Sequence, residues 1–326
     1  MEETVQQLLS RNKGILALDW SPSTIAKQFE SVNLFSTPEL NRQYRQMLVT
    51  AGGIEKYISG IILHDETVHQ KLDSGLSFPE HLEKLGILVG VRADKSSGKY
   101  TNGEEDITLG IEDLDERLKV YSPLGVRFTK WRAGFRISDI YPSKEFLEDN
   151  LNRLVDFAVI SLKNNLMPII EPEVEINGNH TTTRCAEITV VVLTSLFEKL
   201  KEKNVDFKKI LLKTNMVLPG KGNGIKAMPL EVAEATLRTL RKTLPEGLKG
   251  VVFLSGGQNV EESTLNLNEI VKRKQDDPWD LSFSYARALQ QEALSTWSGK
   301  PENIARAQEV FIERLAKVSK ARMGEL

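Results

Sequence analysis

A lysine at the end of a short apolar run is the residue whose type and position best suit covalent catalysis. Lys213 directly follows the apolar residues 210–212, so its side chain should be partly withdrawn from water. In isolation this pattern also suits a lysine whose ammonium group extends to solvent along its apolar stem. If Lys130 and Arg132 lie on the same rim, burial and neighbouring positive charge favour the neutral amine. A neutral amine can attack a carbonyl carbon and form a Schiff base, which then stabilises an adjacent carbanion.

Three carboxylates could move the protons that this chemistry requires. Glu171 and Glu173 lie two residues apart in a run that reads as a strand, so both point to the same face. They could protonate and deprotonate the oxygen of a carbinolamine. Asp19, at the end of another run, could accept a hydroxyl proton when a carbon–carbon bond breaks. The two glutamates could equally form rim salt bridges with Lys130 or Arg132, and both roles can hold together.

The charges at the ends of the apolar runs predict an anionic substrate. Ser255, Gly256 and Gly257 form a turn whose backbone N–H groups could approach a phosphate. This turn is a weak signal alone, but it follows the seventh apolar run, where phosphate sites in (β/α)₈ barrels lie. Arg287 closes the eighth run and could bind phosphate through two hydrogen bonds. The charged candidate residues together carry a net charge of +2, although the whole chain carries −2. They are five cations and three anions: Arg92, Lys130, Arg132, Lys213 and Arg287, and Asp19, Glu171 and Glu173.

The histidines do not form a metal-binding pattern. No two of them are spaced i, i+2 or i, i+4, as ligands on one strand or helix face would be. We therefore predict a reaction that needs no metal and no cofactor. His180 is expected in a solvated loop, and residues 95–103 in a polar loop near the site. The four histidines are His64, His69, His81 and His180.

Eight short apolar runs that end on polar residues are the elements that must position these side chains. Near-continuous apolar runs are typical of parallel strands covered on both faces, and helical patterns fill the gaps between them. An open doubly wound sheet is the alternative, but eight such units favour a single (β/α)₈ TIM barrel over residues 1–326, with a C-terminal helix at about 301–322. The runs are 14–19, 58–64, 87–94, 126–132, 167–173, 210–215, 250–256 and 281–287.

The composition narrows the class of protein further. The net charge of −2 argues against a nucleic-acid binder that relies on bulk positive charge. No apolar run approaches the roughly 20 residues of a membrane-spanning helix, and the acidic N-terminus lacks a hydrophobic signal core. Cys185 is the only cysteine, so no disulfide can form within the chain. We expect a cytoplasmic protein that does not act on a membrane.

Taken together, these motifs make the sequence similar to the class I, Schiff-base fructose-1,6-bisphosphate aldolases. The resemblance covers nearly the whole chain and is specific because many segments match together, although no single one would suffice. The matching segments include GILALD (14–19), NRQYRQML (41–48), FTKWR (128–132), IEPE (170–173), LLKTNMVLPG (211–220), FLSGGQ (253–258) and FSYARALQ (283–290).

The resemblance implies a role for each candidate residue. Lys213 corresponds to the Schiff-base lysine, Glu171 to the acid/base of carbinolamine chemistry and Glu173 to its supporting neighbour. Asp19 corresponds to the residue that handles the C4 hydroxyl proton, with Lys130 as its electrostatic partner. Residues at two ends of the site would bind the sugar phosphate: Ser255, Gly256, Gly257 and Arg287 at the C1 phosphate, and Arg132 and Arg92 at the other end. The family also implies a homo-oligomer, often a tetramer.

Several positions depart from the family pattern, and they concern substrate preference rather than the core chemistry. This chain has Trp20 where the family usually has Glu, Arg92 where it has Lys, Gln28 where it has Arg, Thr214 where it has Pro, and Ala286 where it has Gly. We also expect no C-terminal tail with a terminal tyrosine to enter the site. Two alternatives stay open: a Schiff-base aldolase or transaldolase-type enzyme acting on a related ketose phosphate, and a non-catalytic barrel used for binding.

Overall fold

Eight parallel strands close into a barrel in the computed structural model, which describes residues 1–326. Each of the eight apolar runs overlaps one strand, and the hydrogen-bonded order is β1-β10-β9-β8-β7-β6-β3-β2. The ring closes because β1 pairs with both β10 and β2. The predicted (β/α)₈ barrel is therefore confirmed. The strands are β1 Gly14–Leu18, β2 Ile58–Leu63, β3 Leu88–Arg92, β6 Val126–Phe135, β7 Met167–Val174, β8 Leu211–Thr214, β9 Gly250–Phe253 and β10 Asp280–Tyr285.

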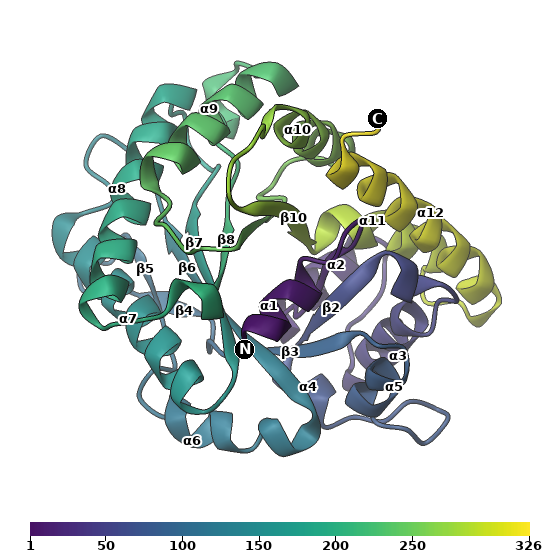
Figure 1. Ribbon diagram of the computed structural model, residues 1–326. Coiled ribbons are helices and arrows are strands. Elements are labelled where there is room, and N and C mark those ends of the chain that lie inside the picture. Colours follow the sequence, from purple (N-terminus) through teal and green to yellow (C-terminus); the bar gives the residue numbers. More distant parts are fainter.

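Helices surround the strands and cover their outer face (Figure 1). Most strand residues are apolar because they contact these helices on one side and the barrel interior on the other; every residue of β1 and β2 is buried. The helices are α1 Glu2–Leu8, α2 Pro22–Glu30, α3 Pro38–Val49, α4 Asp65–Val68, α5 Phe78–Lys84, α6 Leu114–Lys119, α7 Lys144–Lys163, α8 Thr182–Glu202, α9 Pro229–Thr243, α10 Val260–Arg273, α11 Arg287–Trp297 and α12 Ile304–Met323. None of them combines the length and apolar character needed to cross a membrane.

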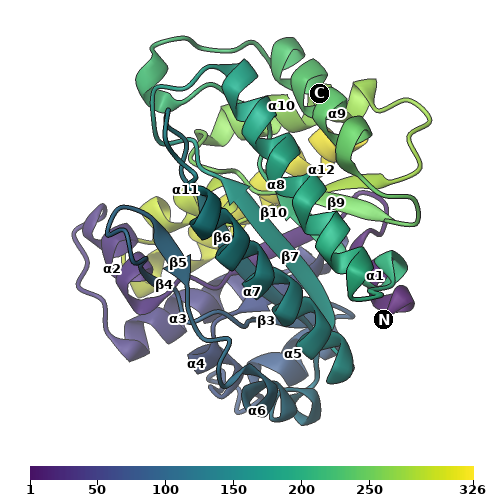
Figure 2. The ribbon, with the colours of Figure 1, turned by 90° about the vertical axis from the view of Figure 1, so that its left-hand side faces the viewer.

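The N-terminal end of the barrel is closed by α1. Val5 and Leu8 of this helix join a small cluster of apolar side chains inside the barrel, which includes Phe128. A side chain at Gly90 would collide with the Phe128 ring, so glycine is needed at that position. Figure 2 shows α1 at one end of the barrel and the opposite end carrying the loops that follow the strands. Catalytic groups in this fold lie at that second end.

Two local expectations differ from the structure. Residues 95–103 do not form a simple loop, because β4 (Ser97–Lys99) pairs with β5 (Asp106–Thr108) in an antiparallel hairpin. The hairpin is fixed by contacts with residues distant in sequence: Tyr100 packs against Phe146, and its hydroxyl donates a hydrogen bond to Asp149 on α7. Arg287 does not end the last strand but begins α11, since β10 stops two residues earlier.

Candidate active site

Lys213 lies near the C-terminal end of the barrel on β8, and only 4% of its surface is exposed. Its Nζ is 3.0 Å from Oε1 of Glu171 on β7. The sequence suggested cations as the immediate neighbours of this amine, whereas its ion-pair partner is a carboxylate. The difference matters chemically because a carboxylate in contact with an ammonium group can accept its proton.

Glu171 links Lys213 to a second buried ion pair. Its Oε2 is 3.2 Å from Nζ of Lys130, and that same ammonium group is 2.6 Å from Oδ2 of Asp19. All four side chains are more than nine-tenths buried. They come from β8, β7, β6 and the end of β1, so strands distant in sequence assemble one continuous chain of alternating charges. The chain holds two formal positive and two formal negative charges.

The ion pairs outweigh the effect of burial on three of these groups. Burial alone would raise the pKa of Asp19, but Lys130, Lys213 and Arg92 hold that pKa well below its ordinary value. Burial would likewise raise the pKa of Glu171, and Lys130 and Lys213 keep it lowered. For Lys130, burial opposes the charge, but Asp19 and Glu171 raise its pKa above the usual range. At neutral pH both carboxylates are therefore ionised and Lys130 is protonated.

Arg132 and Arg92, predicted to bind the far end of the substrate, are both occupied by carboxylates. Arg132 bonds to Glu173 and, at 3.1 Å, to Oε1 of Glu175. Arg92 donates to Oδ1 of Asp94 at 2.7 Å. The predicted salt bridges between the rim cations and the two glutamates are thus both present, as Lys130–Glu171 and Arg132–Glu173. Neither arginine is a free cation.

The predicted phosphate turn lies after β9. Gly256 and Gly257 have φ values of 47° and 81°, which side chains other than glycine rarely adopt. Ser255 is nearly buried, and no hydrogen bond occupies its hydroxyl. Arg287 is half-buried at the start of α11, the element that follows the neighbouring strand β10, and has no ion-pair or hydrogen-bond partner. Its charge is available, unlike those of Arg92 and Arg132.

His180 is buried rather than solvated, which corrects the expectation for this loop. Only 7% of its surface is exposed, and neither ring nitrogen has a hydrogen-bond partner. Cross-loop hydrogen bonds cover the ring: Gly220 N–H donates to the carbonyl of His180, and Gly222 N–H donates to the carbonyl of Gly178. These bonds join the loop after β7 to the loop after β8, a pairing that local sequence does not indicate.

We expect the burial of His180 to make stability depend on pH. Burial lowers the pKa of His180 below 6.5, so the unfolded chain takes up a proton at a higher pH than the folded protein does. Keeping His180 neutral therefore contributes to the free energy of unfolding, and this contribution is fully present above pH 6.5. It is lost as the pH falls towards the pKa of His180 in the folded protein, by about 1.4 kcal/mol for each unit between the unfolded and folded pKa values. Urea unfolding at pH 7.5 and 5.5 should show a smaller loss for His180→Gln than for the unchanged protein. An equal loss in both proteins would contradict this.

Two further residues of the site were not identified from the sequence. Glu175 continues the two-residue spacing of Glu171 and Glu173, so extending the alternation by one step would have found it. Asn215, two residues after Lys213, is buried, and its Oδ1 accepts a hydrogen bond from the backbone N–H of Val174, which ties the end of β8 to the end of β7. No sequence pattern distinguishes that asparagine from a surface residue.

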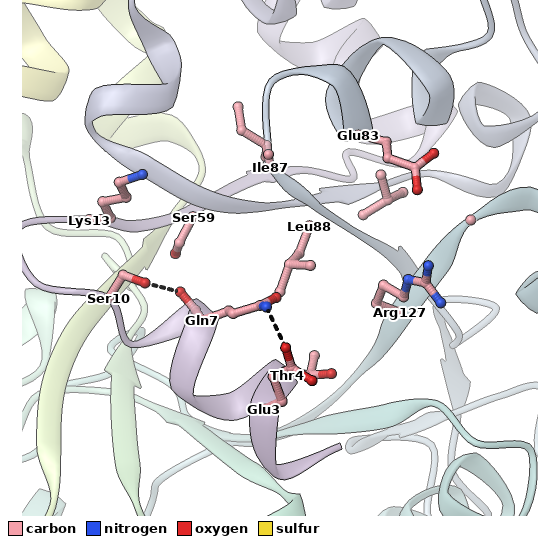
Figure 3. A pocket seen from close by; sticks show the side chains of 13 residues that line it. Glu3, Thr4, Gln7, Ser10, Lys13, Ser59, Glu83, Ile87, Leu88 and Arg127 are labelled. Carbon is pink, nitrogen blue, oxygen red and sulfur yellow. Dashed lines mark hydrogen bonds between the residues drawn. The ribbon is translucent and has the colours of Figure 1, made fainter.

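A cavity of about 670 Å³ lies at the opposite end of the molecule. Figure 3 shows Gln7 and Ser10 of the N-terminal segment and Arg127, at the start of β6, on its wall. None of the predicted site residues lines it, and it opens at the end of the barrel that α1 closes. We assign the chemistry to the C-terminal end, where the buried ion pairs are. No three His, Cys, Asp or Glu side chains gather there or elsewhere in a way that could hold a metal ion.

Comparisons with known proteins agree with this geometry. The model of the family "Fructose-bisphosphate aldolase class-I" matches residues 1–326. The chain is 43% identical to a cytosolic fructose-bisphosphate aldolase 4 from Arabidopsis thaliana, over 96% of this chain and 80% of the plant protein. It is 42% identical to a probable class 1 fructose-bisphosphate aldolase from Xanthomonas campestris, over 100% of this chain and 98% of that protein.

A solved structure gives the same result. The fructose-bisphosphate aldolase of Plasmodium falciparum, determined in complex with TRAP and a small-molecule inhibitor, superposes with a TM-score of 0.96 at 40% identity. The match covers 99% of this chain and 94% of that one. Because the family model spans the whole chain and the fold and sequence agree over nearly full length, the chain belongs to the class I fructose-bisphosphate aldolases.

Proposed function

We propose that this chain cleaves fructose 1,6-bisphosphate reversibly to dihydroxyacetone phosphate and glyceraldehyde 3-phosphate, with Lys213 as the Schiff-base nucleophile. The observation that carries the assignment is the 3.0 Å contact between Lys213 and Glu171 inside the barrel. A buried amine with a carboxylate in contact can be deprotonated without water. The family membership supports the reaction, and the charge chain supports the residue roles.

The first half of the reaction uses Lys213 and Glu171. Glu171 takes a proton from the Lys213 ammonium group, and the free Nζ attacks the C2 carbonyl carbon of the open-chain sugar. Attack leaves the extra proton on nitrogen and a negative charge on oxygen, and that proton moves from nitrogen to oxygen to give the carbinolamine. The proton held by Glu171 then lets the hydroxyl group leave as water, so a protonated imine remains on Lys213. Glu171 is thus the acid and base for this half. Glu173 acts on it only indirectly, because it pairs with Arg132, whose charge helps to lower the pKa of Glu171.

The second half breaks the carbon–carbon bond. Asp19 accepts the proton of the C4 hydroxyl, C4 becomes the aldehyde carbon of glyceraldehyde 3-phosphate, and the electrons of the C3–C4 bond move into the protonated imine to form an enamine. Because Lys130 lowers the pKa of Asp19, proton transfer and bond cleavage should occur together rather than in separate steps. The proton that Asp19 has taken passes through the Lys130 ammonium group, which contacts both carboxylates, to Glu171. Glu171 delivers this proton to C3, and water then releases dihydroxyacetone phosphate from Lys213.

The C1 phosphate is proposed to bind at Ser255, Gly256, Gly257 and Arg287. Arg287→Ala should raise KM for the bisphosphate and weaken binding of dihydroxyacetone phosphate by about 1.5–3 kcal/mol, because a charge-assisted contact is lost. Equilibrium binding of dihydroxyacetone phosphate measures this directly. Arg92→Ala provides a contrast, since Arg92 is already paired with Asp94. Unchanged affinity in Arg287→Ala would place the phosphate elsewhere.

The decisive experiment is borohydride reduction in the presence of dihydroxyacetone phosphate and EDTA, followed by peptide mapping. The label should appear on the peptide that contains Lys213. Assays of cleavage and transfer with sedoheptulose bisphosphate and other ketose phosphates then separate the proposed substrate from related ones. Labelling with no cleavage of any ketose phosphate would point to a barrel that binds sugars without completing the reaction.

We further propose that residues 1–326 act as one catalytic domain, that the protein works in the cytoplasm, and that it assembles as a homo-oligomer such as a tetramer. The name of the Arabidopsis relative, a cytosolic aldolase, supports the location. The resemblance to the family is what supports assembly. Sedimentation at assay concentration tests the oligomeric state.

A further inference from the structure

A lysine outside the predicted site lies directly against the phosphate turn. If a side chain were built on Gly257, its Cβ would be 3.2 Å from Nζ of Lys221 and 2.9 Å from Ile176. Glycine at this position therefore leaves the space in which the Lys221 ammonium group lies. The contact brings the loop after β8 against the turn after β9, on the neighbouring strand.

The backbone of Lys221 is held firmly although its side chain is exposed. Lys221 N–H donates to the carbonyl of Ile176 at 3.0 Å, and the flanking Gly220 and Gly222 donate across the same two loops at 2.8 and 2.7 Å. His180, buried beneath them, fills the space between the loops. The lysine therefore projects from a fixed point, while its four-carbon stem lets the ammonium group adjust to a ligand.

The charge of Lys221 is uncompensated. It takes part in no ion pair, whereas Lys226, five residues later, contacts Glu262 at 3.3 Å. Around the mouth of the barrel Arg92 and Arg132 are neutralised by carboxylates, so Arg287 is the one predicted phosphate ligand with a free positive charge. A phosphate monoester carries nearly two negative charges at neutral pH. One arginine does not balance that charge, and the nearby unpaired ammonium group would.

We propose that Lys221 is a substrate-binding residue that supplies the second positive charge of the phosphate site. This inference rests on the proposed function, because it takes the turn at Ser255–Gly257 as the place where the phosphate binds. It assigns part of the affinity for phosphorylated ligands to the loop after β8, a loop outside the set of residues that the sequence singled out. The role is electrostatic, so it should follow the charge of the side chain rather than its shape.

A series of substitutions at Lys221 tests the proposal. Lys221→Gln should raise the Kd for dihydroxyacetone phosphate and the KM for the bisphosphate about five- to tenfold, with kcat changed less than threefold. Lys221→Glu should raise both the Kd and the KM further, whereas Lys221→Arg should keep both constants within threefold of those of the unchanged protein. The matched control, Lys226→Gln, removes a lysine of the same loop and should change neither constant more than twofold. Because Lys221 is exposed, the thermal midpoint should be the same throughout.

The outcomes separate this inference from the proposed function. If Arg287→Ala weakens dihydroxyacetone phosphate binding and Lys221→Gln does not, Lys221 has no part in the site and the inference is wrong. If neither variant changes that binding, the phosphate lies elsewhere and the proposed site fails with it. A loss in Lys221→Arg as large as in Lys221→Gln would also overturn the inference, because shape rather than charge would then be responsible.

Discussion

Lys213→Met is expected to abolish borohydride trapping of dihydroxyacetone phosphate and to lower turnover by at least ~10³-fold, about 4 kcal/mol of activation free energy. Methionine keeps much of the length and apolar character of the buried stem but has no nucleophilic nitrogen. The loss should therefore appear in kcat, with the protein still folded. Turnover of the bisphosphate and mass spectrometry of the reduced protein measure the two effects.

The control for this substitution is Lys208→Met, which removes an exposed lysine shortly before the same strand. It should leave trapping and turnover unchanged. Removing Lys213 also leaves Glu171 with Lys130 as its remaining ion-pair partner, so thermal unfolding must be recorded for both variants. Label found on Lys130 in the unchanged protein would overturn the assignment of the nucleophile, since both lysines contact Glu171.

The strands could be predicted from sequence because parallel strands in a barrel are buried on both faces. The run at 58–64 contains six consecutive buried strand residues, for example, and needs no alternation to be recognised. Charged residues at the ends of such runs then had to meet at one end of the barrel. That topological argument was sufficient to bring Lys213, Glu171, Lys130 and Asp19 together.

The sequence predicted that the two glutamates could pair with rim cations, but not which cation contacts which carboxylate, because that depends on the register between strands. Arg132 lies opposite Glu171 in the ladder of β6 and β7, yet it bonds to Glu173 and Glu175. Which carboxylate each cation contacts is decided by side-chain reach across that register. The same limit applies to His180, whose burial results from hydrogen bonds to residues some 40 positions later in the chain. Polar segments of this kind read as solvated loops until their partners are known.

Glu171→Gln is expected to lower kcat by about 10²- to 10³-fold while changing KM less than threefold. Glutamine has nearly the same shape and can still accept a hydrogen bond from Lys213, but it cannot take the ammonium proton or return it to the carbinolamine oxygen. Loss of one general acid–base group costs a reaction roughly 10²- to 10⁴-fold in rate. Glu187→Gln, on an exposed position of α8, is the control and should leave kcat unchanged.

The step affected by Glu171→Gln distinguishes the proposed role from a structural one. If Glu171 serves carbinolamine chemistry, the rate of imine formation in a single turnover, followed by rapid quenching in borohydride, should fall by a factor similar to that of kcat. A purely structural role would instead lower the fraction of folded protein and leave the rate per folded molecule intact. Normal imine formation together with slow release of glyceraldehyde 3-phosphate would move Glu171 to the cleavage step, where Lys130 connects it to Asp19 over 3.2 and 2.6 Å. Because Glu171 contacts the Nζ atom that must lose a proton before the imine can form, we expect the first of these outcomes.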